Sequence, residues 1–129
     1  MAKMVLFSAV QGRVLDNGKA VAGAQIERAW RWSWKSEDGA DRTSTAADGS
    51  FALPAVVRSS FFGSLLPHQP QIDQTITIKH GGKAYKAWSH FKGDYDHNGE
   101  LDGRPLRLTC RLESEPALRL RVFGICEFD

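Results

Sequence analysis

Two turn signals in the first half of the chain constrain its fold more than any other feature. Asn17-Gly18 separates the strand-like runs 12–15 and 20–26, and Asp48-Gly49 separates two further runs of the same kind. Both dipeptides favour hairpin turns, because these residues tolerate the positive φ that such turns require. Apolar and polar residues alternate on either side, as in strands with one buried face. The pattern predicts successive antiparallel hairpins.

The rest of the chain continues this pattern. We expect strands at 4–10, 12–15, 20–35, 42–45, 50–53, 71–79, 84–91, 105–112 and 117–122, loops at 36–41 and 93–104, and a hairpin turn at 80–83. In the last of these strands, alternation predicts that Leu118, Leu120 and Val122 point inward. The expected fold is all-β, a single antiparallel β-sandwich of about seven strands. It covers residues 1–129 as one domain.

Several short motifs occur in a fixed order around the two turns. They are Gly12-Arg13-Val14, Asn17-Gly18, Val21-Ala22-Gly23-Ala24-Gln25-Ile26, Thr43-Ser44-Thr45 and Asp48-Gly49-Ser50-Phe51-Ala52-Leu53. In this order they resemble the carboxypeptidase regulatory-like domain, which is a transthyretin-like β-sandwich. The resemblance implies that fold and, because the domain carries no catalytic residues in the carboxypeptidases that contain it, a non-catalytic role. Function must still be argued from a site, since one fold serves many functions.

Composition and charge narrow the classes of function. Hydrophobic residues make up 42% of the 129 residues and charged residues 25%, as in an ordinary globular domain. The net charge is +2 and no basic run of five residues occurs, so we expect no nucleic-acid partner. The apolar run at the N-terminus is too short for a signal peptide and leads directly into a strand. We therefore expect a cytoplasmic protein that does not enter the membrane.

The two cysteines are Cys110 and Cys126. In a cytoplasmic protein we expect them to be reduced and buried as small hydrophobic residues. Both lie in strand-like runs and could point inward, so a disulfide between them stays open as the alternative.

A polar loop is the most metal-like stretch of the chain. Its oxygen-bearing residues Asp94, Asp96, Asn98 and Asp102 resemble the start of an EF-hand calcium loop. The twelfth position is Pro105, where a bidentate glutamate should close the shell, so any affinity should be weak. The alternative is an ordinary turn-rich loop. We expect no bound metal and no cofactor.

Motifs for catalysis are missing from the sequence. The four histidines, His68, His80, His90 and His97, lie in separate segments, and neither HExxH nor CxxC occurs. There is no G-x-S-x-G motif and no glycine-rich phosphate loop. We expect no catalytic residues, so the protein should not be an enzyme.

A tryptophan-rich run suggests a binding surface. Period two places Arg28, Trp30, Trp32 and Trp34 on one strand face and Arg31 on the reverse. Tryptophan and arginine dominate binding hot spots, so these five residues are the first candidate contacts. The alternative is that Trp30 and Trp32 fill the core and Trp34 stays partly exposed.

A second apolar segment contains Phe61 and Phe62, which are further candidate contacts. Such a segment marks an interface if it is exposed and core if it is buried. The leading hypothesis is a non-catalytic protein-binding module. By analogy with small free-standing bacterial proteins, it would be an immunity protein that blocks a secreted toxin, or an adaptor for an effector. The alternative is a carbohydrate-binding module whose tryptophans stack on sugar rings.

Overall fold

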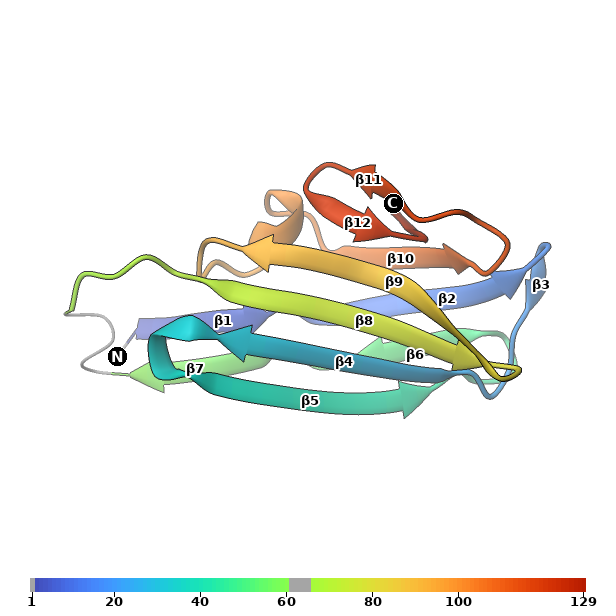
Figure 1. Ribbon diagram of the computed structural model, residues 1–129, viewed down its shortest axis with the longest axis horizontal. Helices are drawn as coiled ribbons and strands as arrows, with labels where there is room; N and C mark the ends of the chain where they lie inside the picture. Colours follow the sequence, from blue (N-terminus) through green and yellow to red (C-terminus); the bar gives the residue numbers. More distant parts are fainter. Residues whose placement is uncertain (1, 61–65) are drawn as a thin grey trace.

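The protein is all-β in the computed structural model, which describes residues 2–60 and 66–129 (Figure 1). These residues form thirteen strands and two short 3₁₀ turns, with no α-helix among them. The strands are β1 (Ala2–Phe7), β2 (Val10–Asp16), β3 (Lys19–Ala20), β4 (Gln25–Trp32), β5 (Glu37–Ser44), β6 (Ser50–Leu53), β7 (Val56–Ser60), β8 (Ile72–His80), β9 (Lys83–Lys92), β10 (Leu106–Arg111), β11 (Ala117–Arg119), β12 (Val122–Gly124) and β13 (Cys126–Phe128). The 3₁₀ turns are η1 (Ser33–Lys35) and η2 (Gly99–Leu101).

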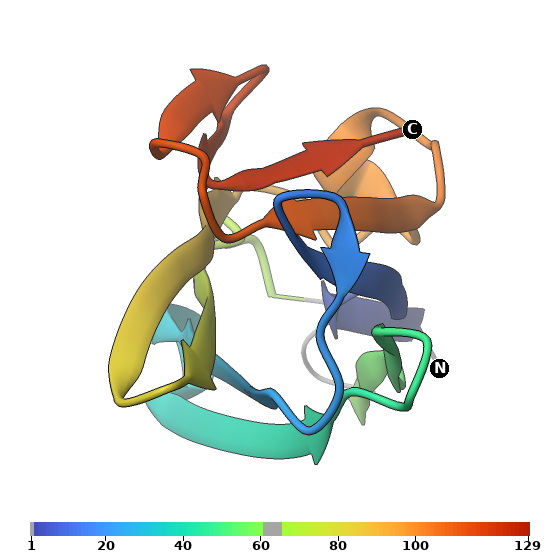
Figure 2. The ribbon, with the colours of Figure 1, turned by 90° about the vertical axis from the view of Figure 1, so that its right-hand side faces the viewer.

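Three sheets surround one core. The largest has six strands in the order β11-β12-β9-β8-β4-β5, the second joins β13-β10-β2-β3 with β6 also paired to β2, and the third pairs β1 with β7. The β2–β10 pair is parallel. Viewed end-on in Figure 2, the sheets enclose a common interior, which apolar side chains from all three fill. The all-β prediction is confirmed, whereas about seven strands were expected and the described residues form thirteen.

Two of the hairpins predicted from turn chemistry are present, whereas the hairpin predicted at Asp48-Gly49 is wrong, because this turn joins β5 of the six-stranded sheet to β6, which pairs with β2 in the second sheet. Asn17 and Gly18 have φ of 50° and 83° between β2 and β3, and Gly81 and Gly82 have φ of 59° and 75° between β8 and β9. Positive φ at both central residues is the pattern of a type I′ turn, whose twist matches that of the flanking strands. Local residue chemistry therefore determines these two turns.

The predicted loop at 36–41 is wrong, because β5 already begins at Glu37. Gly39, expected in this loop, lies opposite Trp30 in the β4–β5 register. A Cβ atom at Gly39 would lie 2.2 Å from the Trp30 indole, so the ring packs directly over the glycine. The glycine serves close packing within a strand rather than a reversal of the chain.

The predicted strand at 117–122 is interrupted. Leu120 has a φ of 54° and begins a two-residue turn that separates β11 from β12. Alternation therefore stops at the turn, and Leu118 and Leu120 are exposed instead of pointing inward, while Val122 is buried as predicted. The sequence contains no glycine or asparagine at this turn that would have revealed it.

The expectation of reduced cysteines is also wrong, because Cys110 and Cys126 form a disulfide. The two residues lie directly opposite each other in the antiparallel β10–β13 pair, and both are buried. The register of two strands separated in sequence brings them together. The bond ties the last strand to the second sheet.

A buried glutamate holds the loop after β9 against the core. Both oxygens of Glu100 accept hydrogen bonds from Ser8, through its backbone N–H at 2.8 Å and its hydroxyl at 2.7 Å. The Gln74 amide donates to the same carboxylate at 2.9 Å, and its oxygen accepts from the Trp88 indole at 3.1 Å. Buried polar groups that are bonded in this way fix one arrangement of the chain.

Candidate functional site

The face of β4 that was predicted to bind a partner faces the core. Arg28, Trp30 and Trp32 are only 0%, 9% and 2% exposed, so they are not available to a partner on the surface. The alternative reading, in which Trp30 and Trp32 fill the core, describes the structure. Trp34 lies in η1 beyond the strand, is partly exposed as expected, and stacks on His68 with ring centroids 3.8 Å apart.

Arg28 is buried because its charge is paired within the fold. Its guanidinium donates to both carboxylate oxygens of Asp41 on β5, at 2.9 and 2.5 Å. It also lies over the Phe7 ring, 4.9 Å from the centroid. Bidentate pairing and contact with an aromatic face offset part of the cost of removing an arginine from water. Arg28 therefore stabilises the interior.

The other predicted contacts lie elsewhere. Arg31 is half-exposed on the reverse face of β4, where it pairs with Asp38 at 2.9 Å. Phe61 and Phe62 lie outside the described residues. Of the residues predicted to contact a partner, Arg31 lies on an open sheet face, the outward side of the six-stranded sheet.

The outward side of the six-stranded sheet, here called the outer face, carries rows of side chains that follow the strand register. One row across β5, β4, β8 and β9 consists of small residues: Ala40, Ala29, Thr75 and Ser89. The rows on both sides carry mostly longer side chains. They are Arg42, Glu27, Thr77 and Lys86 on one side, where Thr77 is the small exception, and Asp38, Arg31, Asp73 and Phe91 on the other. Small side chains between long ones form a groove across the strands, here called the cross-sheet groove.

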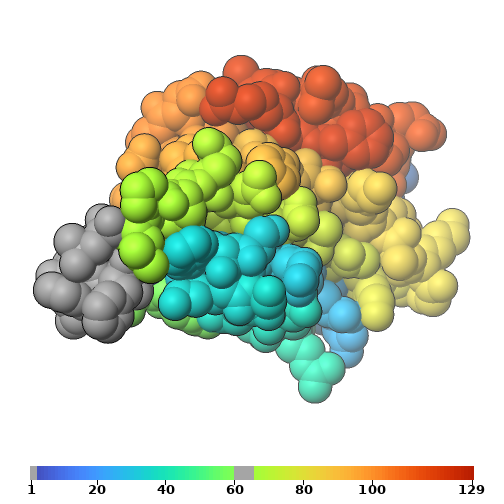
Figure 3. Space-filling model, turned by 60° about the vertical axis from the view of Figure 1, so that its left-hand side comes forward, coloured from blue at the N-terminus to red at the C-terminus, as the bar shows by residue number. Residues whose placement is uncertain are grey.

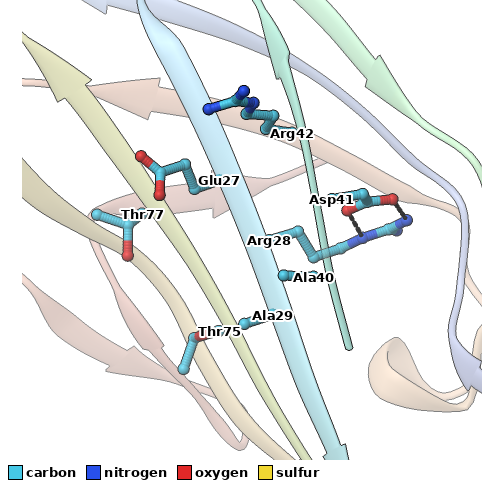
Figure 4. Close-up of a pocket in the computed structure, with 8 residues that line it drawn as sticks. All are labelled: Glu27, Arg28, Ala29, Ala40, Asp41, Arg42, Thr75 and Thr77. Atoms are coloured by element: carbon cyan, nitrogen blue, oxygen red, sulfur yellow. Dashed lines mark hydrogen bonds and ion pairs between the residues drawn. The ribbon is translucent and has the colours of Figure 1, made fainter. Parts of the chain in front are cut away.

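Two hollows lie along the cross-sheet groove. The first has a volume of about 450 Å³ and is lined by Glu27, Arg28, Ala29, Ala40, Asp41, Arg42, Thr75 and Thr77 (Figure 4). In Figure 4 the Arg28–Asp41 pair lies on one side of the strands, and Glu27 and Thr77 lie on the other. The second hollow, of about 280 Å³, shares Thr75 and Thr77 with the first and extends to Lys86 and Ser89 on β9.

The cross-sheet groove ends at exposed apolar side chains. These are Phe91 (54% exposed), Leu118 (69%), Leu120 (53%) and Phe123 (39%), here called the hairpin patch. Phe123 lies opposite Ser89 and Leu118 lies opposite Phe123, so the patch continues the row of small residues onto β12 and β11. The β11–β12 hairpin adjoins β9 at this edge of the sheet, as Figure 1 shows.

A bulge in β9 brings a charge to the hairpin patch. The β8–β9 register passes from Ile76–Trp88 to Thr77–Lys86, which leaves Ala87 as the extra residue. The bulge turns Lys86 outward, where its Nζ lies 5.6 Å from the centroid of the Phe123 ring. A cation over an aromatic face is attracted to it, and here it borders an apolar surface.

The loop that resembled a calcium site already holds a cation of its own. The fully buried Lys92 ammonium donates to the Asp94 carboxylate at 2.7 Å and to the backbone carbonyls of Asp94 and Asp96 at 3.1 and 2.8 Å. Partial burial raises the pKa of Asp94, but hydrogen bonds from Lys92 and from the Asp96 N–H outweigh it and hold that pKa below its ordinary value. Asp102 instead faces Arg121, at 2.8 Å. Across residues 2–60 and 66–129, no group of three or more histidine, cysteine, aspartate or glutamate side chains is placed to hold a metal ion.

An aromatic cluster lies at the opposite end of the sheet from the β8–β9 turn. The Trp32 indole donates to the Tyr95 hydroxyl at 2.9 Å, and that hydroxyl is 2.6 Å from Nε2 of His68. Nδ1 of His68 donates to the Leu66 carbonyl at 2.9 Å, since a carbonyl only accepts. Burial raises the pKa of Tyr95. Figure 3 shows the chain after residue 65 lying against the segment that follows β4, so the cluster closes this end of the fold.

Comparison with known protein families matches residues 10–115 to a domain of unknown function, DUF6795. The match includes the cross-sheet groove and ends before β11. No curated protein and no solved structure matches the chain. Among the residues described, no helix has the length and apolar character needed to cross a membrane.

Proposed function

The chain belongs to the DUF6795 family, and from its geometry we propose that it is a non-catalytic protein-binding module whose partner covers the outer face of the six-stranded sheet. The hairpin patch is the observation that carries this proposal. Its four large apolar side chains are each more than a third exposed. Phe123 pairs with Leu118 across the hairpin and with Ser89 on β9, Leu120 lies in the hairpin turn, and Phe91 lies two residues beyond Ser89 on β9. Contiguous exposed apolar surface is a property of interaction sites, whereas isolated exposed residues are ordinary.

The cross-sheet groove supports the same proposal. Its long bordering side chains pair on the surface, as Arg31 does with Asp38 and Glu27 with Lys79. Exposed ion pairs of this kind contribute about 0–1 kcal/mol each, so a partner could replace them at little cost. Protein interfaces commonly have an apolar centre and a polar rim. Here the hairpin patch would supply the apolar centre, and the charged side chains along the groove would supply the rim.

The kind of binding module and the kind of fold are proposed on separate grounds. We propose an immunity protein or effector adaptor as the kind of binding module, by analogy with small free-standing bacterial proteins, and the transthyretin-like sandwich as the kind of fold, from the sequence resemblance. The carbohydrate-binding alternative loses its support, because Trp30 and Trp32 are buried and Trp34 is stacked on a histidine. Indoles in those positions leave little aromatic face for a sugar ring.

Affinity purification from the native host at native expression tests the proposal. The wild-type chain should retain one stoichiometric protein. A Phe91→Ser/Phe123→Ser double variant should lose it, while a Leu66→Ser variant should keep it, because Leu66 is equally exposed but lies outside the patch. Thermal unfolding of all three chains controls for folding. A wild-type chain that retains no stoichiometric protein, or a double variant that keeps it, contradicts the proposal.

A further inference from the structure

We infer that the β11–β12 hairpin is the anchor of this interface and that it packs Leu120 against the apolar face of an amphipathic helix with an acidic rim on the partner protein. The inference rests on the proposed function and adds the chemistry of the partner. Three observations carry it: an unfavourable residue at the turn, a hairpin fixed by polar contacts, and the Lys86 cation beside the apolar patch.

The turn places a leucine where the backbone favours glycine. Arg119 and Val122 close the hairpin, and of the two residues between them Leu120 has a φ of 54° while Arg121 does not have a positive φ. Glycine is the usual residue at this first position of a two-residue turn. A leucine there is strained, since its Cβ crowds the following carbonyl. More than half of the Leu120 side chain is nevertheless exposed, so burial does not offset that strain. Strain of this kind is typical of functional positions.

Polar contacts fix the hairpin independently of its leucines. Nδ1 of the buried His90 donates to the Arg121 carbonyl at 2.9 Å. The Arg119 guanidinium donates to the Gly124 carbonyl at 3.1 Å. A Cβ atom on Gly124 would lie 2.1 Å from the Ala87 carbonyl oxygen, so only glycine permits β12 to approach the bulge this closely. The backbone of the hairpin is therefore set before any partner binds, which lowers the entropic cost of binding.

Charge selects the partner. Lys86 lies over Phe123, and Arg121, which is 65% exposed, lies beside Leu120 in the turn. A second copy of this chain would bring like charges together at the same patch, which disfavours self-association here. Arg121 is already paired with Asp102, whereas Lys86 forms no ion pair among the described residues, so Lys86 is the cation that a partner carboxylate would neutralise. A helix with an apolar face bordered by carboxylates fits both the exposed leucines and the Lys86 cation.

Two helical peptides of about 20 residues test the inference directly. They share one apolar face of leucine and phenylalanine at positions i, i+3, i+4 and i+7, and differ only in flanking residues, glutamate in one and lysine in the other. Fluorescence anisotropy should show the acidic peptide binding at least about tenfold more tightly than the basic one, with the difference shrinking as salt is added. Equal binding of both peptides, or no binding of the acidic peptide, overturns the inference.

Leu120→Gly and Leu120→Asn separate binding from folding. Both residues tolerate positive φ, so the melting temperature should stay unchanged or rise slightly. Affinity for the acidic peptide should fall about tenfold or more, because burial of one leucine contributes about 1.5–3 kcal/mol. Leu66→Ser is the matched control and should bind as the wild type does. A marked fall in melting temperature would make Leu120 a residue of the fold and overturn the inference.

A vesicle arm distinguishes the membrane. Sedimentation with phosphatidylcholine vesicles, with and without phosphatidylglycerol, should show no binding that depends on Leu120. Leucine-dependent binding to the anionic vesicles overturns the protein-partner inference. The proposed function fails separately, when the native purification retains no stoichiometric protein.

Discussion

Breaking the Cys110–Cys126 disulfide should lower the stability of the folded chain by about 3 kcal/mol. The two cysteines are 16 residues apart, and closing a loop of that length removes about 3 kcal/mol of conformational entropy from the unfolded chain at 25 °C. For a domain of this size, that corresponds to a melting temperature lower by about 10 °C. The effect should centre on β13, because that strand pairs with β10 alone among the described strands.

The assay is thermal unfolding followed by circular dichroism. It compares the oxidised wild type, the wild type in strong reductant and a Cys110→Ala/Cys126→Ala variant, which removes any doubt about access of the reductant to a buried bond. Thiol titration of the native chain before and after denaturation counts free cysteines. Two free thiols in the oxidised native chain, or a double variant that melts with the wild type, would refute the reasoning.

Three further changes probe separate parts of the fold. Gly39→Ala should lower the free energy of unfolding by about 1–3 kcal/mol in urea titrations, since its Cβ would overlap the indole packed over it, while Gly93→Ala, which has open space around its Cα, should change little. Lys92→Met should lower the free energy of unfolding by about 3 kcal/mol, because it removes the ammonium that pairs with the Asp94 carboxylate and the carbonyls of Asp94 and Asp96. In calorimetry, calcium at millimolar concentration should stabilise that variant and leave the wild type unaffected. A hydrogen bond from Arg58 lowers the pKa of Glu37, so this pair stabilises the fold above the ordinary glutamate pKa and the contribution is lost as the pH falls through the lowered pKa. Melting curves between neutral and acid pH should show a smaller acid loss for Glu37→Gln than for the wild type, and an equal loss in both would contradict the assignment.

Local chemistry made part of this fold predictable. The turns at Asn17-Gly18 and at 80–83 follow from residues that tolerate positive φ, and both are present. The inward face of β10, with Leu106, Leu108 and Cys110, follows from simple alternation and is buried as expected. In such cases the residues that determine the structure are neighbours in the sequence.

The features that sequence reasoning missed depend on contacts between distant residues. Gly39 carries the same dipeptide signal as a turn, yet it serves the indole of the neighbouring strand. The disulfide depends on the register between β10 and β13. Leu120 forms its turn without glycine or asparagine, so the alternation of apolar and polar residues in the sequence shows no break there. Alternation therefore predicted that Leu118 and Leu120 point into the core, whereas both are exposed.

The candidate site was missed for a related reason. Period two identified the two faces of the tryptophan strand, but the pattern does not say which face another sheet will cover. Burial of Arg28 beside Asp41 illustrates the difficulty, because a charged residue usually signals the solvent side. Apolar residues at 91, 118 and 123 were visible in the sequence, yet only strand pairing brings them to one corner of the sheet. The resemblance to the carboxypeptidase regulatory-like domain stays a prediction.

Site-specific photocrosslinking in the native host tests the central claim most directly. A photoreactive phenylalanine analogue placed at Phe123 should form one dominant crosslinked product with a single protein, because that ring lies at the centre of the proposed interface. The same analogue at Leu66, an exposed position outside the patch, should not form that product. A product that appears only from Leu66, or from neither position, would contradict the assignment of the outer face as the binding surface.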